Sequence, residues 1–453
     1  MKWCLFYRLV CLGVRNKIEL RINNSIMIRF SNVMITSLIL HNIPLINNNH
    51  PRDVKYKYMR SIITPEYIKN FSCIADKCED HCCHSWDISI DKSTYKFMTQ
   101  KSSLKVKSAD VIIRTKGEES PYYAKIRLNS DGICPFREES GLCEVHKEHG
   151  HKRLSLTCQS YPRTFTIRGN KKEHNLQLSC PEAARQVLLN PASMQFHQKN
   201  TTNDAFAANN YTRPNWHAAV QQFLVDILFI NDISLEQRLF YIGITLRLIE
   251  PHKDNAEELH KRLLLCCEKI NNKNFDKLYR EQRTSSDFYP GLLIQFFNYH
   301  IHLKSTRSFK VESTRFNLLY QQLLEALSLT NDDSYEQYKI LQHGFNNHYR
   351  EYFAQNSHIW INYILYVFYQ NDFPSKSMQQ VFDNLIDDIF IMRGALSTLA
   401  SMRPLTDDDV ILVVQTYHRT RSHIADYIDN IKRIRSEVGI DEELLSLMLI
   451  KIH

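Results

Sequence analysis

The sequence predicts a mainly α-helical protein, in which a small cysteine-rich, metal-binding module of mixed α/β structure is followed by an all-helical domain. Two observations lead to this fold class. Eight of the 12 cysteines fall between residues 73 and 180, and apolar residues recur every three or four positions from residue 216 onward. With 43% hydrophobic and 11% aromatic residues, such a helical domain can bury a sizeable core.

Residues 1–58 differ in charge from the rest of the chain. They hold nine Lys and Arg against Glu19 and Asp53, which is +7 of the total net charge of +8 and leaves +1 for residues 59–453. The near-neutral remainder argues against a nucleic-acid-binding protein, which needs a concentrated basic face. We interpret residues 1–58 as a basic extension outside the core, with Met59 as the natural first residue; a targeting or membrane-surface arm is the alternative.

The compartment decides how the cysteines are used. The apolar N-terminal stretch is interrupted by Arg8, and no window reaches the roughly 18 to 20 apolar residues of a membrane-spanning helix. We therefore expect a cytoplasmic protein without a membrane span. Cysteine clusters in such proteins bind metal more often than they form disulfides.

The spacing of the cysteines leaves the metal open between zinc and an iron–sulfur cluster, because thiolates hold both. Eight thiols exceed one site of either kind. Cys82 and Cys83 are adjacent, and neighbouring side chains tend to point apart, so we expect one of them to be structural. The candidate ligands are Cys73, Cys78, Cys82, Cys83, Cys134, Cys143, Cys158 and Cys180.

The module is expected to span residues 59–190. Alternation predicts strands at 86–91 and 122–128, with a short helix between them that Asp91 or Ser93 caps and that ends at Met98. A hairpin is predicted at 165–178, turning at Gly169-Asn170. Pro181 predicts the start of a helix, so Cys180 should lie at a helix N-terminus, where exposed amides lower the pKa of a thiol or favour an anionic cluster.

After a polar linker at residues 190–210, helical spacing continues to the C-terminus, and we assign residues 211–453 to the helical domain. The Cys266-Cys267 pair is expected in its core. A capping box at Thr406 begins the last helix. The predicted helices are 216–230, 234–249, 256–270, 288–303, 314–327, 335–356, 359–369, 378–400 and 406–438.

Glycine is too sparse for the usual nucleotide-binding loops. The chain has 11 glycines, and no three of them have the spacing of a G-x-G-x-x-G turn. A nucleotide-like cofactor would therefore need a site of another design, and we expect a cleft between the module and the helical domain.

The cysteine motifs resemble one family, the bacterial flagellin lysine-N-methylases. The matching stretches are FSCIADKCEDHCCHSWDISID from Phe71, CPF from Cys134, GLCEVH from Gly141, TCQSYPR from Thr157 and LSCPEAAR from Leu178. Weaker likeness continues in ISLEQRLFYIGI from Ile233, INYILYVF from Ile361 and LTDDDVILVVQTYHRTRSH from Leu405. The resemblance therefore covers roughly residue 59 to the end.

This resemblance implies a methyltransferase that uses S-adenosylmethionine to methylate surface lysines of flagellin and that contains an iron–sulfur cluster, of 4Fe–4S type, with zinc as the alternative metal. The matching motifs offer Asp87, Tyr161 and Glu182 as catalytic candidates, and Arg163 and Arg185 as groups that bind the cofactor. Each of the five can also be structural, and His146, His149 and His151 can be plain surface residues. A metal- or cluster-binding protein for storage, delivery or redox work, without methyl transfer, remains the alternative function.

Overall fold

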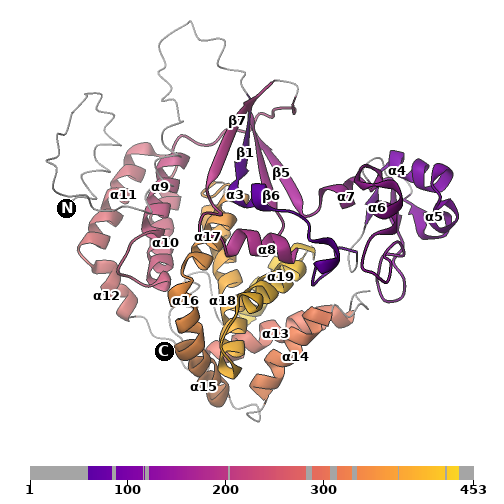
Figure 1. Cartoon of the computed structure of the whole chain (residues 1–453). Coiled ribbons are helices and arrows are strands. Elements are labelled where there is room, and N and C mark those ends of the chain that lie inside the picture. Colours follow the sequence, from indigo (N-terminus) through magenta and orange to yellow (C-terminus); the bar gives the residue numbers. More distant parts are fainter. Residues whose placement is uncertain are drawn as a thin grey trace, which may run out of the picture.

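The protein is described from a computed structural model. It covers residues 60–83, 88–115, 117, 122–202, 205–281, 288–306, 314–328, 334–375, 377–423 and 426–437. The N-terminal extension, residues 1–58, lies outside this part of the chain, as does Asp87. The described fold is mainly α-helical, as predicted (Figure 1).

A four-stranded sheet lies at one end of the helices. Its order is β5-β6-β1-β7, with β1 parallel to β6 and antiparallel to β7. The predicted hairpin is confirmed, because β5 and β6 pair antiparallel across Gly169, whose φ of 61° suits glycine. The strands are β1 (Arg60–Pro65), β5 (Arg163–Arg168), β6 (Lys171–Leu176) and β7 (Phe196–Thr201).

Strand β7 corrects the prediction of a polar linker at residues 190–210. It is an edge strand with four consecutive exposed residues, so it carries no apolar alternation that could reveal it. Its partner β1 was also missed. Both strands owe their formation to pairing with distant segments rather than to their own pattern.

Residues 88–158, called here the small module, have a hydrophobic core of their own. Strands at 86–91 and 122–128 were predicted, and β2 and β4 lie there, joined with β3 in the order β2-β4-β3. Asp91 caps α4 by accepting a hydrogen bond from the Thr94 amide, 2.9 Å away. The elements are β2 (Ser89–Ile90), α4 (Lys92–Lys96), α5 (Lys105–Val111), β3 (Ile112–Arg114), β4 (Ala124–Ile126), α6 (Glu144–His149) and α7 (Leu156–Ser160).

The predicted helices from residue 216 onward are present, with three differences. The 335–356 helix contains a π-helical turn at Phe345–Tyr349, the 406–438 helix is two helices, and α12 was not predicted because it is short and buries only Phe275. The helices are α9 (His217–Leu228), α10 (Leu235–Ile249), α11 (Ala256–Asn271), α12 (Asn274–Glu281), α13 (Phe288–Thr306), α14 (Thr314–Ser328), α15 (Ser334–Gly344), α16 (Arg350–Gln355), α17 (His358–Gln370), α18 (Met378–Met402), α19 (Asp407–His423) and α20 (Tyr427–Glu437).

The main core joins these helices to the sheet and to α3 (Glu66–Asn70) and α8 (Pro181–Leu188). Tyr366 of α17 donates a hydrogen bond to the Leu176 carbonyl of β6 at 2.8 Å, and Cys266 and Cys267 are buried in the same core, as predicted. The sheet and α8 therefore pack with the helices. The small module, which ends in α7, lies apart from α9–α12 (Figure 1). The domain boundary at residue 190 stays a prediction.

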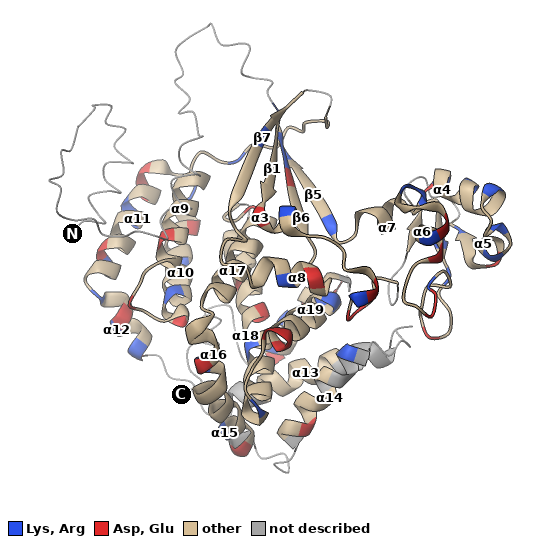
Figure 2. Cartoon of the chain, in the orientation of Figure 1, with Lys and Arg blue, Asp and Glu red and all other residues tan. Residues whose placement is uncertain are grey.

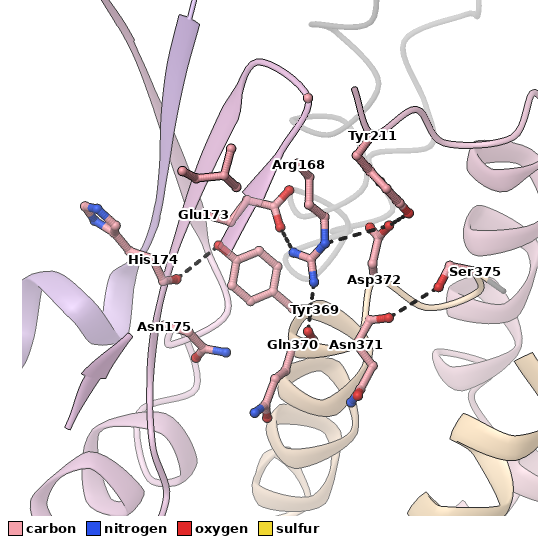
Figure 3. Close-up of polar contacts among 12 residues, drawn as sticks. Arg168, Glu173, His174, Asn175, Tyr211, Tyr369, Gln370, Asn371, Asp372 and Ser375 are labelled. Carbon is pink, nitrogen blue, oxygen red and sulfur yellow. Dashed lines mark hydrogen bonds and ion pairs between the residues drawn. The ribbon is translucent and has the colours of Figure 1, made fainter. Parts of the chain in front are cut away.

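A polar junction fastens the hairpin to the end of α17 (Figure 3). Arg168 pairs with Glu173 and donates to the Gln370 carbonyl at 2.9 Å. Asp372 accepts hydrogen bonds from Tyr211 and from Arg213, the latter at 2.7 Å. Because Glu173 and Asp372 are both buried and both paired, removing either arginine would leave a buried carboxylate short of a partner.

Charges of both signs are distributed over the helices (Figure 2), in keeping with the near-neutral sum for residues 59–453. Within the described ranges, no helix combines the length and the apolar character that crossing a bilayer requires.

Candidate functional site

The loop from Cys73 to Cys83, called here the cysteine loop, is fastened to the helical core by Asp80. Asp80 is buried and accepts hydrogen bonds from the side chains of Gln415, at 2.6 Å, and Arg419, both on α19. Gln415 also donates to the Ser179 carbonyl at 3.2 Å, just before α8. This clasp holds the cysteine loop, α8 and α19 together.

Three further cysteines come from turns and helix starts of the small module. The Cys134 amide donates to the Cys83 carbonyl at 2.7 Å, which ties the module to the cysteine loop. Cys143 is the N-cap of α6, and Cys158 lies in α7. A backbone N–H donates to the Cys134 sulfur from Phe136, and two donate to Cys143 from Val145 and His146.

Cys180 is the N-cap of α8, with Pro181 at the first helical position, as predicted. Its sulfur accepts hydrogen bonds from the amides of Glu182 and Ala183. These amides lower the pKa of the Cys180 thiol, as expected, but burial outweighs them and raises it to about 12 overall. Amides aimed at sulfur stabilise a thiolate once a metal has displaced the proton.

Burial likewise raises the pKa of Cys78, Cys134, Cys143 and Cys158, whereas Cys82 differs from them. Burial raises the pKa of Cys78 to about 11 and those of Cys134 and Cys158 to about 12. A hydrogen bond from Cys83 lowers the pKa of Cys82 to about 7 and raises that of Cys83. Cys82 is therefore the first of these thiols to ionise as the pH rises.

A cavity of about 260 Å³ opens where the cysteine loop, the small module, α8 and α19 meet. Six of the eight candidate cysteines line it, together with Tyr161, Glu182 and Arg419. The lining cysteines are Cys73, Cys78, Cys82, Cys83, Cys143 and Cys180.

The sequence left the metal open between zinc and an iron–sulfur cluster. Over the residues that the structure describes, no three or more His, Cys, Asp or Glu side chains converge as ligands of one ion. The described side chains therefore do not form a ready tetrahedral zinc site. The backbone amides that donate to Cys134, Cys143 and Cys180 would stabilise thiolates bound to either metal, so the donor chemistry does not choose between zinc and an iron–sulfur cluster. None of the cysteines in the described ranges forms a disulfide.

The catalytic candidates Tyr161 and Glu182 lie together at the cavity, whereas Asp87 lies outside the described residues. Burial raises the pKa of Tyr161 well above its ordinary value, and its hydroxyl is 3.1 Å from the Ser179 hydroxyl. Tyr161 therefore stays protonated at neutral pH. The Glu182 carboxylate accepts hydrogen bonds from Arg185, at 2.5 Å, and Gln186, at 2.7 Å.

The two arginine candidates differ in their surroundings. Arg185 is paired with Glu182 and Glu79, so its charge is already compensated by two carboxylates. Arg163 is exposed, and its guanidinium lies 4.6 Å from the centre of the Phe71 ring, which lines the cavity. Neither arginine is among the residues that line the cavity, and Arg163 reaches it only through its contact with Phe71.

Sequence reasoning missed Asp80, Gln415 and Arg419, although all three lie in stretches that carry the family resemblance. Gln415 and Arg419 are four residues apart, and therefore on one helix face, which is a recognisable signal. The contact with Asp80 crosses more than 300 residues of sequence and could not be foreseen. Of the three histidines considered, only His146 lines the cavity.

Comparison with known proteins agrees with the resemblance. Residues 221–449, about half of the chain, match the model of the FliB lysine N-methylase C-terminal domain. The lysine-N-methylases of Salmonella choleraesuis and Salmonella typhimurium are each 25% identical over 411 residues, which is 86% of this chain and 99% of those proteins. The flagellar biosynthetic protein FliU of Salmonella muenchen is 35% identical over 144 residues, covering 31% of this chain and 85% of FliU. No solved structure matches the chain significantly.

Proposed function

Because this chain belongs to the FliB lysine N-methylase family, we propose that it transfers the methyl group of S-adenosylmethionine to surface lysines of flagellin, in the cytoplasm. The observation that carries the proposal is the match of residues 221–449 to the lysine N-methylase domain, a range that includes α19 and the cavity residue Arg419. Resemblance in the cysteine motifs extends the proposal to an iron–sulfur cluster held by the cysteines around the cavity.

The reaction sets two requirements for the site. A lysine attacks only as the neutral amine, so a group with an ordinary pKa of about 10.4 must lose its proton. The nitrogen lone pair then forms the new N–C bond while the C–S bond of the sulfonium breaks, and S-adenosylhomocysteine leaves. The protein must therefore supply a proton acceptor and hold the amine in line with the methyl group.

Glu182 and Tyr161 divide these tasks in the proposal. Glu182 is the proton acceptor, because its carboxylate lines the cavity and has lone pairs beyond those used by Arg185 and Gln186. Tyr161 orients the amine through its protonated hydroxyl, since burial keeps it from acting as a base. Arg163 binds the carboxylate of S-adenosylmethionine, whereas Arg185 positions Glu182.

The proposal is tested with purified chain, flagellin and radiolabelled S-adenosylmethionine. We expect label on flagellin lysines and none when flagellin is omitted. Arg163→Ala should weaken S-adenosylmethionine binding roughly tenfold or more while the iron content stays unchanged, because one charge-assisted contact is lost. Arg153→Ala is the matched control, since Arg153 also lies over a ring, that of Phe97 at 4.5 Å, away from the cavity.

If flagellin stayed unlabelled, the proposal of methyl transfer would be wrong, and metal or cluster binding without methyl transfer would remain as the function. That alternative rests on one observation, namely that six cysteines line a single cavity. Mass spectrometry of flagellin from cells with and without the gene gives an independent answer, because the lysine masses must differ by whole methyl groups.

A further inference from the structure

Strand β5 is an edge strand of the four-stranded sheet and lies nearest α7 (Figure 1). It pairs with β6 alone, so one side of its backbone is turned away from the sheet. Such an edge can take up an extended chain as an added strand, which is a common way for proteins to bind peptides. What the edge can bind depends on which of its backbone groups are free.

The register of the hairpin shows which residues of β5 turn their backbone outward. Residues of an antiparallel pair alternate between exchanging hydrogen bonds with the partner strand and pointing away from it. The Gln177 amide donates to the Pro162 carbonyl at 2.8 Å, and Pro162 lies just before β5 in the same register. Even-numbered residues of β5 thus bond to β6, and the backbone groups of Arg163, Phe165 and Ile167 point away from it.

One end of this outward edge is closed and the other is open. The Ile167 carbonyl accepts a hydrogen bond from the Asn209 side chain at 2.8 Å, which agrees with the outward direction. Among the described residues, nothing hydrogen-bonds to the outward backbone groups of Arg163 and Phe165. Both side chains are exposed, that of Phe165 to 58%. The open part of the edge is therefore the first half of β5.

This open part begins at the cavity. Tyr161 and Pro162, which directly precede β5, both line the cavity. The Arg163 side chain donates to the Phe71 carbonyl at 3.3 Å, and Phe71 lines the cavity as well. Since a strand advances about 3.3 Å per residue, a chain paired with Phe165 and Arg163 would reach the cavity wall within one or two further residues.

The side chains along the edge decide where a lysine of the added strand would lie. The ammonium group of Lys172 is 4.0 Å from the centre of the Phe165 ring, and it would repel a second ammonium group there. At the cavity end, by contrast, the carboxylate of Glu182 is among the lining groups. An added strand would therefore place an apolar or acidic side chain over Phe165 and its lysine, on a flexible four-carbon stem, in the cavity.

We propose that the open edge of β5 binds an extended segment of flagellin as an added strand and delivers the target lysine of that segment to the cavity. This inference rests on the proposed function, because it states how the substrate of that reaction is held. Main-chain hydrogen bonds supply the binding, so the segment needs an extended backbone rather than one fixed sequence.

Hydrogen exchange at single-residue resolution tests the pairing on the wild-type chain, with flagellin and without S-adenosylmethionine. We expect slower exchange at the amides of Arg163 and Phe165 when flagellin is added, and no change at Thr164 and Thr166, whose amides already bond to β6. Unchanged exchange at Arg163 and Phe165 would overturn the proposal. Protection that grows with the concentration of the chain alone would also overturn it, because a second copy would then occupy the edge. No methyl transfer takes place in this measurement, so failure of the proposed function leaves its result intact.

The variant Phe165→Pro tests the consequence for catalysis. It removes the outward N–H but no hydrogen bond to β6, and proline is tolerated at such edge positions. We expect the KM for flagellin to rise roughly tenfold at unchanged kcat, because main-chain hydrogen bonds to the substrate are lost equally before and during the reaction.

Ile167→Pro is the matched control. It removes an equivalent outward N–H where Asn209 already covers the edge, so the KM should stay unchanged. An unchanged KM in Phe165→Pro, or an equal rise in both variants, would contradict docking at the open edge.

Discussion

The small module and the helical part of the chain are stabilised in different ways. The small core contains 12 buried hydrophobic residues, and three partly buried cysteines pack against it. The main core draws on all twelve helices from α9 to α20 and on the sheet, with fully buried Tyr363, Phe390 and Leu396 at its centre. A core as small as that of the module rarely suffices alone, and natural domains of this size add disulfides or metal. The helical part needs no such addition.

The largest expected effect is on the stability of the small module relative to that of the helical part. Removing the proposed iron–sulfur cluster with a chelator under reducing conditions should unfold the small module, because the metal–thiolate bonds that would stabilise it are then lost. Hydrogen exchange should then show lost protection at β4 and retained protection at α18. Equal protection of β4 before and after chelation would mean that the small core is stable without metal.

The next largest effect is a loss of stability when a side chain is added where two helices of the main core pack closely. A Cβ on Gly344 of α15 would lie 2.0 Å from the Ser397 carbonyl of α18, where backbone cannot move aside easily. Gly344→Ala should lower the free energy of unfolding by about 3 kcal/mol, at the upper end of the cost of overpacking. Denaturant titration followed by circular dichroism measures it.

Gly291→Ala on α13 is the matched control, since nothing lies within 4 Å of the added carbon. It should leave stability unchanged or raise it by up to about 1 kcal/mol through helix propensity. Similar losses in both variants would show that α15 and α18 are not in close contact in solution.

The smallest effect concerns the half-buried carboxylate of Asp226 on α9. Burial raises the pKa of Asp226 to about 6, so the folded state binds more protons than the unfolded state between the ordinary value of 3.8 and pH 6, and stability falls as the pH rises through that window. Asp226→Asn should therefore stabilise the protein by about 1 kcal/mol at pH 7 and not at pH 3.5. Thermal unfolding at both pH values measures this, with the exposed Asp232→Asn as control. An equal gain at both pH values would rule out the buried charge as its cause.

The two regions also differ in how far the sequence predicts them. Helical spacing located α9–α11 and α13–α19, because each buries an apolar stripe that repeats along its own sequence. The position of the candidate site could be predicted only from its cysteines. Asp80, Gln415 and Arg419 were missed, since their contact joins segments that nothing local relates. Strand β7 was missed for the same reason: its partners, not its residues, define it.

The position of β1 has a consequence for biosynthesis. Of the four strands in this sheet, β1 leaves the ribosome first. Its Ser61 pairs with Lys171 and Asn200, which are translated only after the whole small module. The sheet must therefore wait for a long loop to close, and such distant pairings are slow to form. A module that had already bound the proposed cluster would shorten that loop to a compact insert. Nascent chains made during iron starvation should accordingly keep β1 unpaired for longer and be more exposed to proteolysis.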